Sequence, residues 1–170
     1  MLTTHARSLG LRVYTDWETP VGLTPNFDVY FLGMQQNPFK YLRPASAFVF
    51  PSSWEEFPMA LGRAMICSLP VLSTDCPIGP REMLAPATKS PATPLRQVER
   101  GVFGLLLPML TQPATLAADQ AVWTEAMATL LADAPEQRRL GRMARERMQD
   151  FTRERIFGQW IQLVEEVQRG

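Results

Sequence analysis

The sequence predicts an α/β fold, a parallel sheet flanked by helices and followed by a segment made only of helices. Short apolar runs alternate with stretches of helical periodicity, which is typical of βαβ units in a sheet covered on both faces. From residue 114 onward only helical patterns remain. The 170 residues are 46% apolar, enough for one domain, with an α/β core at 27–108 and a helical segment at 114–170.

The α/β part begins with residues 27–33, a mostly apolar run that ends in glycine and predicts a buried strand followed by a turn. A polar stretch from Thr15 to Pro25 precedes it without explanation. Asn37 and Pro38 then suit the start of a short helix. Residues 47–51 predict a second buried strand.

The next helix is predicted over residues 58–67. Its spacing of apolar residues gives a buried face made of Leu61, Ala64 and Met65. A third strand is predicted at 71–75, and Pro80 then opens a short helix. A surface loop rich in Pro, Ala, Thr and Ser follows at 85–94, and a fourth strand is predicted at 101–108.

Three helices are predicted after residue 114, and they end near residues 131, 149 and 168. The second is rich in arginine and suggests a face for anionic lipid or RNA. Seven acidic residues between Asp133 and Glu166 offset seven arginines between Arg138 and Arg155, so a salt-bridged, solvated surface is favoured. The third helix carries an apolar stripe that must be buried against something.

Charge and rare residues exclude several classes of protein. Lys and Arg total 17, as do Asp and Glu, so the chain lacks the overall positive charge of a nucleic-acid binder. Cys67 and Cys76 have neither zinc nor redox spacing, and His5 is the only histidine, so no metal site or cofactor is predicted. No signal peptide or apolar run of about 20 residues is seen, which predicts a cytoplasmic protein that meets a membrane only peripherally.

Two polar loops follow the second and third predicted strands: S-S-W-E-E-F-P-M and T-D-C-P-I-G-P-R-E. In a parallel sheet, ligands bind outside the carboxyl ends of the strands, where helix N-termini present free amides, so these loops suit an anionic ligand. Glu55, Asp75 and Glu82 equally fit the plain role of acids that stabilise helix ends. The residues alone leave both readings open.

The segment from Asn37 to Leu84 resembles the donor-binding, C-terminal half of family 4 glycosyltransferases of the GT-B fold. The family pattern there is approximately P-S-x-x-E-G-F-P-M-x-L-x-E-A-M-A-C-G-x-P-V-x-x-T-D-x-x-x-G-P-x-E-I-L, and this chain follows it in one register without gaps. Weaker similarity extends from about Val29 to the C-terminus. The resemblance implies a Rossmann-like sheet and retaining transfer of a sugar from a nucleotide-sugar donor, without a metal.

The resemblance also implies site residues. Glu55 corresponds to the first carboxylate of the family's glutamate pair and faces the donor sugar as the catalytic group. The implied donor-binding residues are Gly33 and Met34 beside the base, Phe57, Pro58 and Met59 at the sugar and diphosphate, and Thr74, Asp75 and Gly79 in the neighbouring loop. These positions suit a diphosphate at helix N-termini and a carboxylate near an oxocarbenium-like transition state.

The chain departs from the family pattern in three ways. The second glutamate, which accepts hydrogen bonds from ribose, is replaced by Arg63, a donor-only cation. Two glycines are replaced by Glu56 and Ser68. Set against the family pattern, we expect the N-terminal, acceptor-binding domain to be missing and this part alone to be inactive.

Two functions therefore stand against each other. The first is a glycosyltransferase, present here as its donor-binding domain, whose partners are a nucleotide-sugar, the missing domain and a glycan or lipid-linked acceptor, with no nucleic acid. If the protein meets a membrane, the inner face is expected. The alternative is a degenerate, non-catalytic nucleotide-sugar-binding or interaction module, which Arg63 and Glu56 favour.

Overall fold

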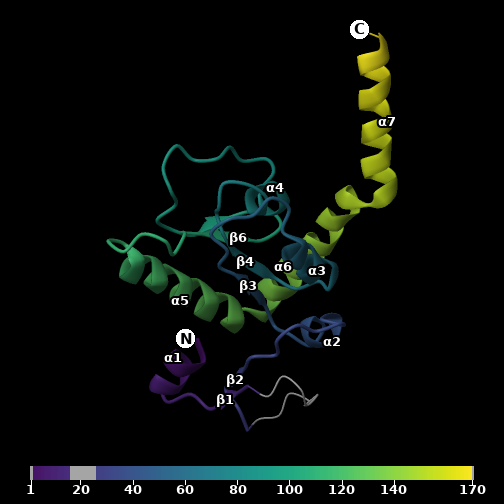
Figure 1. Ribbon diagram of the computed structural model, residues 1–170. Coiled ribbons are helices and arrows are strands. Elements are labelled where there is room, and N and C mark those ends of the chain that lie inside the picture. The colour runs from purple at the N-terminus through teal and green to yellow at the C-terminus, as the bar shows by residue number, and fades with distance from the viewer. Residues whose placement is uncertain (1, 16–25, 170) are drawn as a thin grey trace. The chain divides into compact units, whose positions relative to one another are not determined.

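The computed structural model describes residues 2–15 and 26–169, so most of the polar stretch from Thr15 to Pro25 lies outside the described residues. The chain divides into two compact units, Met1–Pro38 and Phe39–Gly170. Each unit is a separate body of contacts. Figure 1 shows the elements of both.

The first unit consists of helix α1 (Leu2–Ser8) and two short parallel strands, β1 (Val13–Tyr14) and β2 (Val29–Tyr30). Arg12 and Asp28 join the strands through an ion pair of 2.7 Å, which lowers the pKa of the Asp28 carboxyl to about 2. The strand predicted over 27–33 is thus only two residues long. It is half-buried, which corrects the prediction of a buried strand, because among the described residues of this unit only Ala6 is buried.

The second unit contains a four-stranded sheet in the order β3-β4-β6-β5. Strands β3 (Phe48–Phe50), β4 (Val71–Thr74) and β6 (Leu105–Leu107) are parallel, whereas β5 (Glu99–Arg100) pairs antiparallel with β6. The α/β fold with a mainly parallel sheet is therefore as predicted. The helices are α2 (Phe39–Leu42), α3 (Met59–Ile66), α4 (Pro80–Leu84), α5 (Leu116–Ala132), α6 (Ala134–Arg147) and α7 (Arg153–Arg169), with a 3₁₀ turn, η1 (Met148–Phe151), before α7.

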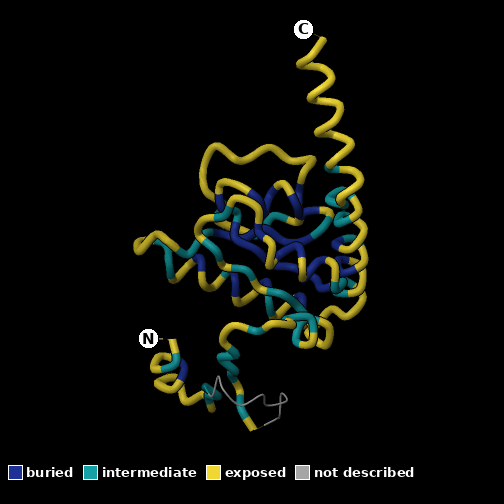
Figure 2. Tube along the Cα trace, turned by 45° about the vertical axis from the view of Figure 1, so that its right-hand side comes forward, coloured by how far each residue is buried: buried dark blue, intermediate teal, exposed yellow. Residues whose placement is uncertain are grey.

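Side chains of the central strands alternate between two cores, one on each face of the sheet. Val71 and Leu106 pack with the buried faces of α3 and α4, whereas Leu72, Leu105 and Leu107 pack with α5. Helix α6 contributes to both cores. The predicted stripe of α3 is confirmed, because Leu61, Ala64 and Met65 are completely buried. Figure 2 shows this buried centre in dark blue.

The predicted fourth strand begins later than expected. Residues 101–104 form a turn, in which the Gly101 amide donates to the Gly104 carbonyl at 2.9 Å, and the strand starts only at Leu105. A Cβ at Gly101 would lie 2.4 Å from the Leu84 carbonyl oxygen. The glycine that resembles a strand start in the sequence therefore serves a close approach between this turn and α4.

A second close approach joins α3 to α6. Ser68 follows α3 with a φ of 61°, the left-handed conformation that favours glycine, and it stands where the family pattern has glycine. Its carbonyl oxygen faces Gly141, where an added Cβ would lie only 2.1 Å away. The end of α3 and the middle of α6 are thus in direct backbone contact.

Helix α7 differs from the other long helices. None of its described residues is buried, although the spacing predicts a buried stripe of Ile156, Trp160, Leu163 and Val167. Ile156 is half-buried, and the other three are exposed. Figure 2 shows most of it exposed. Among the described residues, the prediction of a buried stripe is therefore wrong for Trp160, Leu163 and Val167.

Candidate functional site

The candidate site lies at the carboxyl ends of β3 and β4. Residues 51–58 lead from β3 into α3, and residues 75–79 lead from β4 into α4. Because β3 and β4 are parallel neighbours, both loops emerge at the same edge of the sheet. The two polar loops singled out in the sequence therefore lie next to each other.

Gly79 and Thr74 hold these two loops in contact with each other. Gly79 has a φ of 95°, and a Cβ added there would lie 2.6 Å from the Pro58 ring and 3.1 Å from the Glu56 carbonyl oxygen. The Thr74 hydroxyl, at the end of β4, donates to the Ser52 carbonyl in the other loop. Neither loop can shift at these points without disturbing the other.

Glu55 is half-buried and held by its own loop. The Ser52 hydroxyl lies 2.7 Å from its Oε1 and donates a hydrogen bond to it. Burial and the Glu55 carboxylate both raise the pKa of the nearby Cys76 thiol, so that buried cysteine stays protonated beside the carboxylate. The result is an oriented negative charge at the edge of the sheet.

Helix α3 begins beside this carboxylate without a side-chain cap. Pro58 occupies its N-cap, and the first intrahelical bond is donated by the Gly62 amide to the Pro58 carbonyl at 3.1 Å. The amides of the first turn, from Met59 on, therefore have no intrahelical partner. Phe57 and Met59 are exposed there, and the Phe57 ring also contacts Phe151 of η1, 5.5 Å between centroids.

The structure brings together most, but not all, of the predicted site residues. Those at the carboxyl edge of the sheet in the second unit are Glu55, Phe57, Pro58, Met59, Thr74, Asp75 and Gly79. Arg63 lies on α3, exposed, one turn beyond these first residues. Gly33 and Met34 belong to the first unit, where Met34 is fully exposed.

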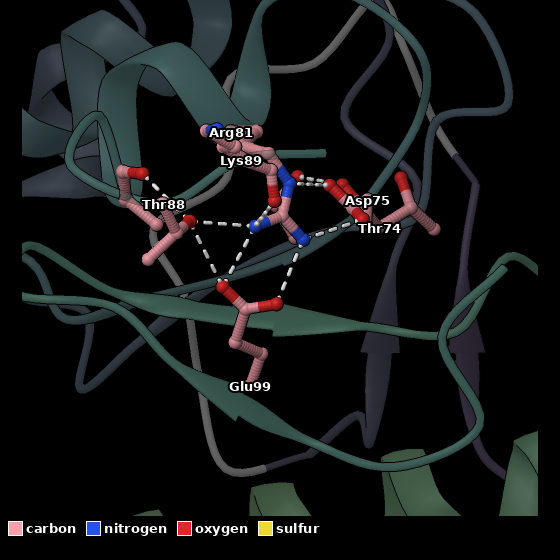
Figure 3. Close-up of polar contacts among 8 residues, drawn as sticks. Thr74, Asp75, Arg81, Thr88, Lys89 and Glu99 are labelled. Carbon is pink, nitrogen blue, oxygen red and sulfur yellow. Dashed lines mark hydrogen bonds and ion pairs between the residues drawn. The ribbon is translucent and has the colours of Figure 1, made fainter. Parts of the chain in front are cut away.

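A buried arginine lies behind this edge, and the sequence prediction missed it. Arg81 of α4 is 7% exposed and bonds both oxygens of Asp75, at 2.9 and 2.7 Å. It also bonds both oxygens of Glu99, at 2.7 and 2.8 Å, and the Thr88 hydroxyl at 2.7 Å. Figure 3 shows the guanidinium between the two carboxylates.

Within the Arg81 cluster, Arg81 and Glu99 each favour the charged form of the other. Arg81 lowers the pKa of the Glu99 carboxyl, and the two carboxylates raise the pKa of Arg81 itself. Since Arg81 occupies both oxygens of Asp75, that side chain braces the loop from within. The G-P-R-E string in the sequence held Arg81, but its partner Glu99 lies 18 residues further on and gave no local signal.

Two further properties concern metals and membranes. Among the described residues, no three His, Cys, Asp or Glu side chains come together as a metal site would require. Within the same residues, every helix is too short or too polar to span a bilayer.

Comparison with known proteins adds a family and a fold. Residues 11–133 match the family described as Glycosyl transferases group 1. The uncharacterized glycosyltransferase MJ1059 of Methanocaldococcus jannaschii is 33% identical over 146 residues, which cover 81% of this chain and 36% of that relative. The chain thus spans about a third of the length of that relative.

Among solved structures, the crystal structure of TarM resembles this chain with a TM-score of 0.52 and 22% sequence identity. The match covers 80% of this chain and 23% of that one. At this identity the likeness concerns the fold, which is the Rossmann-like α/β arrangement of GT-B glycosyltransferases.

Proposed function

The chain belongs to the Glycosyl transferases group 1 family, and on that premise we propose that it is the donor-binding, C-terminal half of a family 4 glycosyltransferase. The proposed reaction is retaining transfer of a sugar from a nucleotide-sugar to a glycan or lipid-linked acceptor, without a metal. The main support is the position of Glu55, whose carboxylate is held beside the uncapped start of α3 at the carboxyl edge of the sheet.

The proposed roles follow from charge. The free amides at the start of α3 suit the diphosphate of the donor, because a helix N-terminus combines unpaired donors with a positive dipole. The Glu55 carboxylate suits the positive charge that develops on the sugar as its bond to the diphosphate breaks. Phe57 and Met59, both exposed, offer apolar surface beside the sugar.

Gly79 and Thr74 support this site as positioning residues. Gly79 allows the second loop to approach Pro58 at the N-cap of α3, and Thr74 bonds the Ser52 carbonyl. Ser52 in turn orients Glu55 through its hydroxyl. Gly33 and Met34 remain candidates for contact with the base.

One observation favours the alternative of a non-catalytic binding or interaction module. Arg63 is exposed and stands where the family has a carboxylate for the ribose hydroxyls. A guanidinium offers only donors, so the usual bonds from ribose to that position are lost. Transfer also requires an acceptor held close to the donor. We propose that a further part of a longer protein binds that acceptor.

The test uses NMR to monitor binding of a panel of UDP-, GDP- and ADP-sugars to the chain. We expect one donor to shift the amides of the first turn of α3 and of Gly79, with Arg63→Glu binding roughly tenfold more tightly because a charged acceptor is restored. A second variant, Glu55→Gln, should change only the NMR signals near the bound sugar. Glu166→Gln, on exposed α7, is its matched control. If no donor shifts the α3 amides, the proposed site is wrong.

Activity separates the enzyme from the module. In a longer protein that contains the acceptor-binding part, Glu55→Gln should abolish transfer while donor binding persists. Donor binding without any transfer in that longer protein would favour the module instead.

A further inference from the structure

Three arginines on α6 face the solvent without partners. Arg138, Arg142 and Arg145 are spaced i, i+4 and i+7, which places them on one face of the helix, and all three are exposed. Within the described residues, none of the three has an ion pair or a hydrogen bond. The expectation of a salt-bridged surface is therefore wrong for this face of α6. It is right for other arginines of the helix: Arg139 pairs with Glu136 at 2.7 Å, and Arg147 pairs with Asp150 at 2.6 Å.

These arginines line an open groove of about 490 Å³, whose other lining residues are Ser68, Glu146 and Gln149. We call it the arginine groove. Three guanidinium groups against one carboxylate leave its walls with an excess of two positive charges at neutral pH. The contact between Gly141 and the Ser68 carbonyl holds the wall from α3 against α6.

Unpaired arginines at this spacing are unfavourable for the helix that carries them. Like charges at i, i+3 and i, i+4 repel each other, and no acidic side chain bonds to any of the three among the described residues. An anion in the groove would relieve this repulsion. Guanidinium groups bind phosphate through paired N–H donors, and three of them close together suit an anion that can carry more than one negative charge, such as phosphate.

The arginine groove is separate from the candidate donor site. Ser68 lies at the end of α3 and just before β4, whereas Glu55 and Met59 lie at the start of α3 and just after β3. The eight residues of α3 separate the two places by about 12 Å along the helix axis. A ligand in the groove would therefore not be the donor diphosphate bound at the carboxyl edge.

We propose that the arginine groove is a second binding site, for a phosphate-bearing ligand held by Arg138, Arg142 and Arg145. Ser68 also lines the groove, and its side chain is a hydroxyl, which is able to donate a hydrogen bond. The ligand's phosphate belongs either to a soluble molecule or to the headgroup of an anionic lipid. The chemistry of recognition is the same in both cases.

The experiment compares Arg142→Gln with Arg139→Gln in the full chain. Both remove one positive charge from α6, but Arg142 lines the groove and is unpaired, whereas Arg139 bonds Glu136. Inorganic phosphate and pyrophosphate are titrated at constant ionic strength, and the amides of Ser68 and Arg142 are followed by NMR. Binding to phosphatidylcholine vesicles with and without phosphatidylglycerol is measured by cosedimentation.

We expect Arg142→Gln to weaken binding of the responding probe at least fivefold, and Arg139→Gln to leave it within about twofold of the unchanged chain. Saturation by free phosphate would identify a soluble ligand, and binding only to the anionic vesicles would identify a lipid headgroup. Arg142→Gln should unfold at the same or a slightly higher temperature, because it relieves repulsion. Equal loss in both variants, or no binding of either probe, would overturn the proposal.

Discussion

Gly79 is the residue on which the geometry of the carboxyl edge depends most directly. Its φ of 95° is a conformation that side chains with a Cβ rarely adopt, and its Cα faces the Pro58 ring and the Glu56 carbonyl. Both neighbours are rigid, one a ring and the other backbone. A side chain at position 79 would therefore push the two loops apart.

We predict that Gly79→Ala lowers the free energy of unfolding by at least about 2 kcal/mol, from backbone strain together with overpacking against Pro58. Urea unfolding measures this change. Gly158→Ala is the matched control, because an added Cβ there meets nothing within 4 Å, and alanine should leave stability equal or slightly higher. Equal stability of the Gly79 variant and the unchanged chain would contradict the close approach.

Glu99 gives a prediction about pH. Arg81 lowers its pKa from the ordinary value of 4.5, so the folded state favours the charged form. Its contribution to stability is fully present above about pH 5 and is lost as the pH falls through the lowered folded pKa. Replacement by glutamine should cost about 1 to 2 kcal/mol at neutral pH, because Arg81 loses a charged partner.

The check is the free energy of unfolding of Glu99→Gln and of the unchanged chain from pH 7 to about pH 3. We expect the difference between them to shrink steadily below about pH 5. Glu166→Gln, which removes an exposed carboxylate from α7, should show no such convergence. A constant difference across the range would mean that the charge of Glu99 contributes nothing.

Among the elements, α7 is the one whose sequence pattern and environment disagree. The stripe was predicted from spacing alone, and its helix is present, but Trp160, Leu163 and Val167 are 60%, 49% and 74% exposed. A contiguous apolar surface of this kind is typical of an interaction site. The helix is also neutral, with three arginines and three glutamates, so charge does not oppose contact between copies.

We predict that the 170-residue chain associates with itself through α7 as its concentration rises. Analytical ultracentrifugation of the unchanged chain and of Trp160→Ser tests this, with the variant expected to shift toward monomer because it loses the largest exposed apolar side chain of the stripe. Gln162→Ser, elsewhere on the same helix, is the control. Monomers of the unchanged chain at high concentration would refute the prediction.

The elements differ in how well the sequence predicts them, because only some of them have a clear pattern of apolar residues along their own length. Helix α3 was predicted nearly to the residue, since its apolar spacing reports directly on its buried face. Strands β1 and β5 were missed, because two residues each leave no readable alternation. The predicted start of β6 is too early, because the sequence does not show whether Gly101 lies in a turn or in a strand.

The same distinction holds for the site. The loops that carry Glu55 and Gly79 were predicted to meet, because parallel strands bring their carboxyl ends to one edge. The bond from Ser52 to Glu55 and the double pairing of Arg81 depend on side-chain geometry and were not predictable. The unpaired arginines of α6 were not predicted, because the acidic residues equal the arginines in number in the sequence but, among the described residues, pair with only some of them.

At the scale of the molecule, the two units differ in how much they bury. The second unit has a core on each face of its sheet, whereas in the first unit Ala6 is the only buried residue among those described. Short strand pairs without a core are only marginally stable. The first unit should therefore open locally far more often than the second.

Hydrogen exchange measures this difference. The Phe31 amide, which bonds the Tyr14 carbonyl in the first unit, should exchange at least about a hundredfold faster than the amide of Leu106 in the central sheet of the second. Arg12→Ala, which removes the ion pair with Asp28, should speed exchange at Phe31 and leave Leu106 unchanged. Similar protection at the two amides would show that the first unit is as stable as the second.

The loop between α4 and β5 has a practical consequence for anyone who handles the protein. Its residues 86–94 are all exposed, while Arg81 and Thr88 tie its first half to Glu99 at the start of β5. The two elements it connects are therefore held together by contacts other than the covalent chain. A fluorescent label, an affinity tag or a new pair of termini placed at residues 90–94 should leave both cores and the carboxyl edge of the sheet undisturbed.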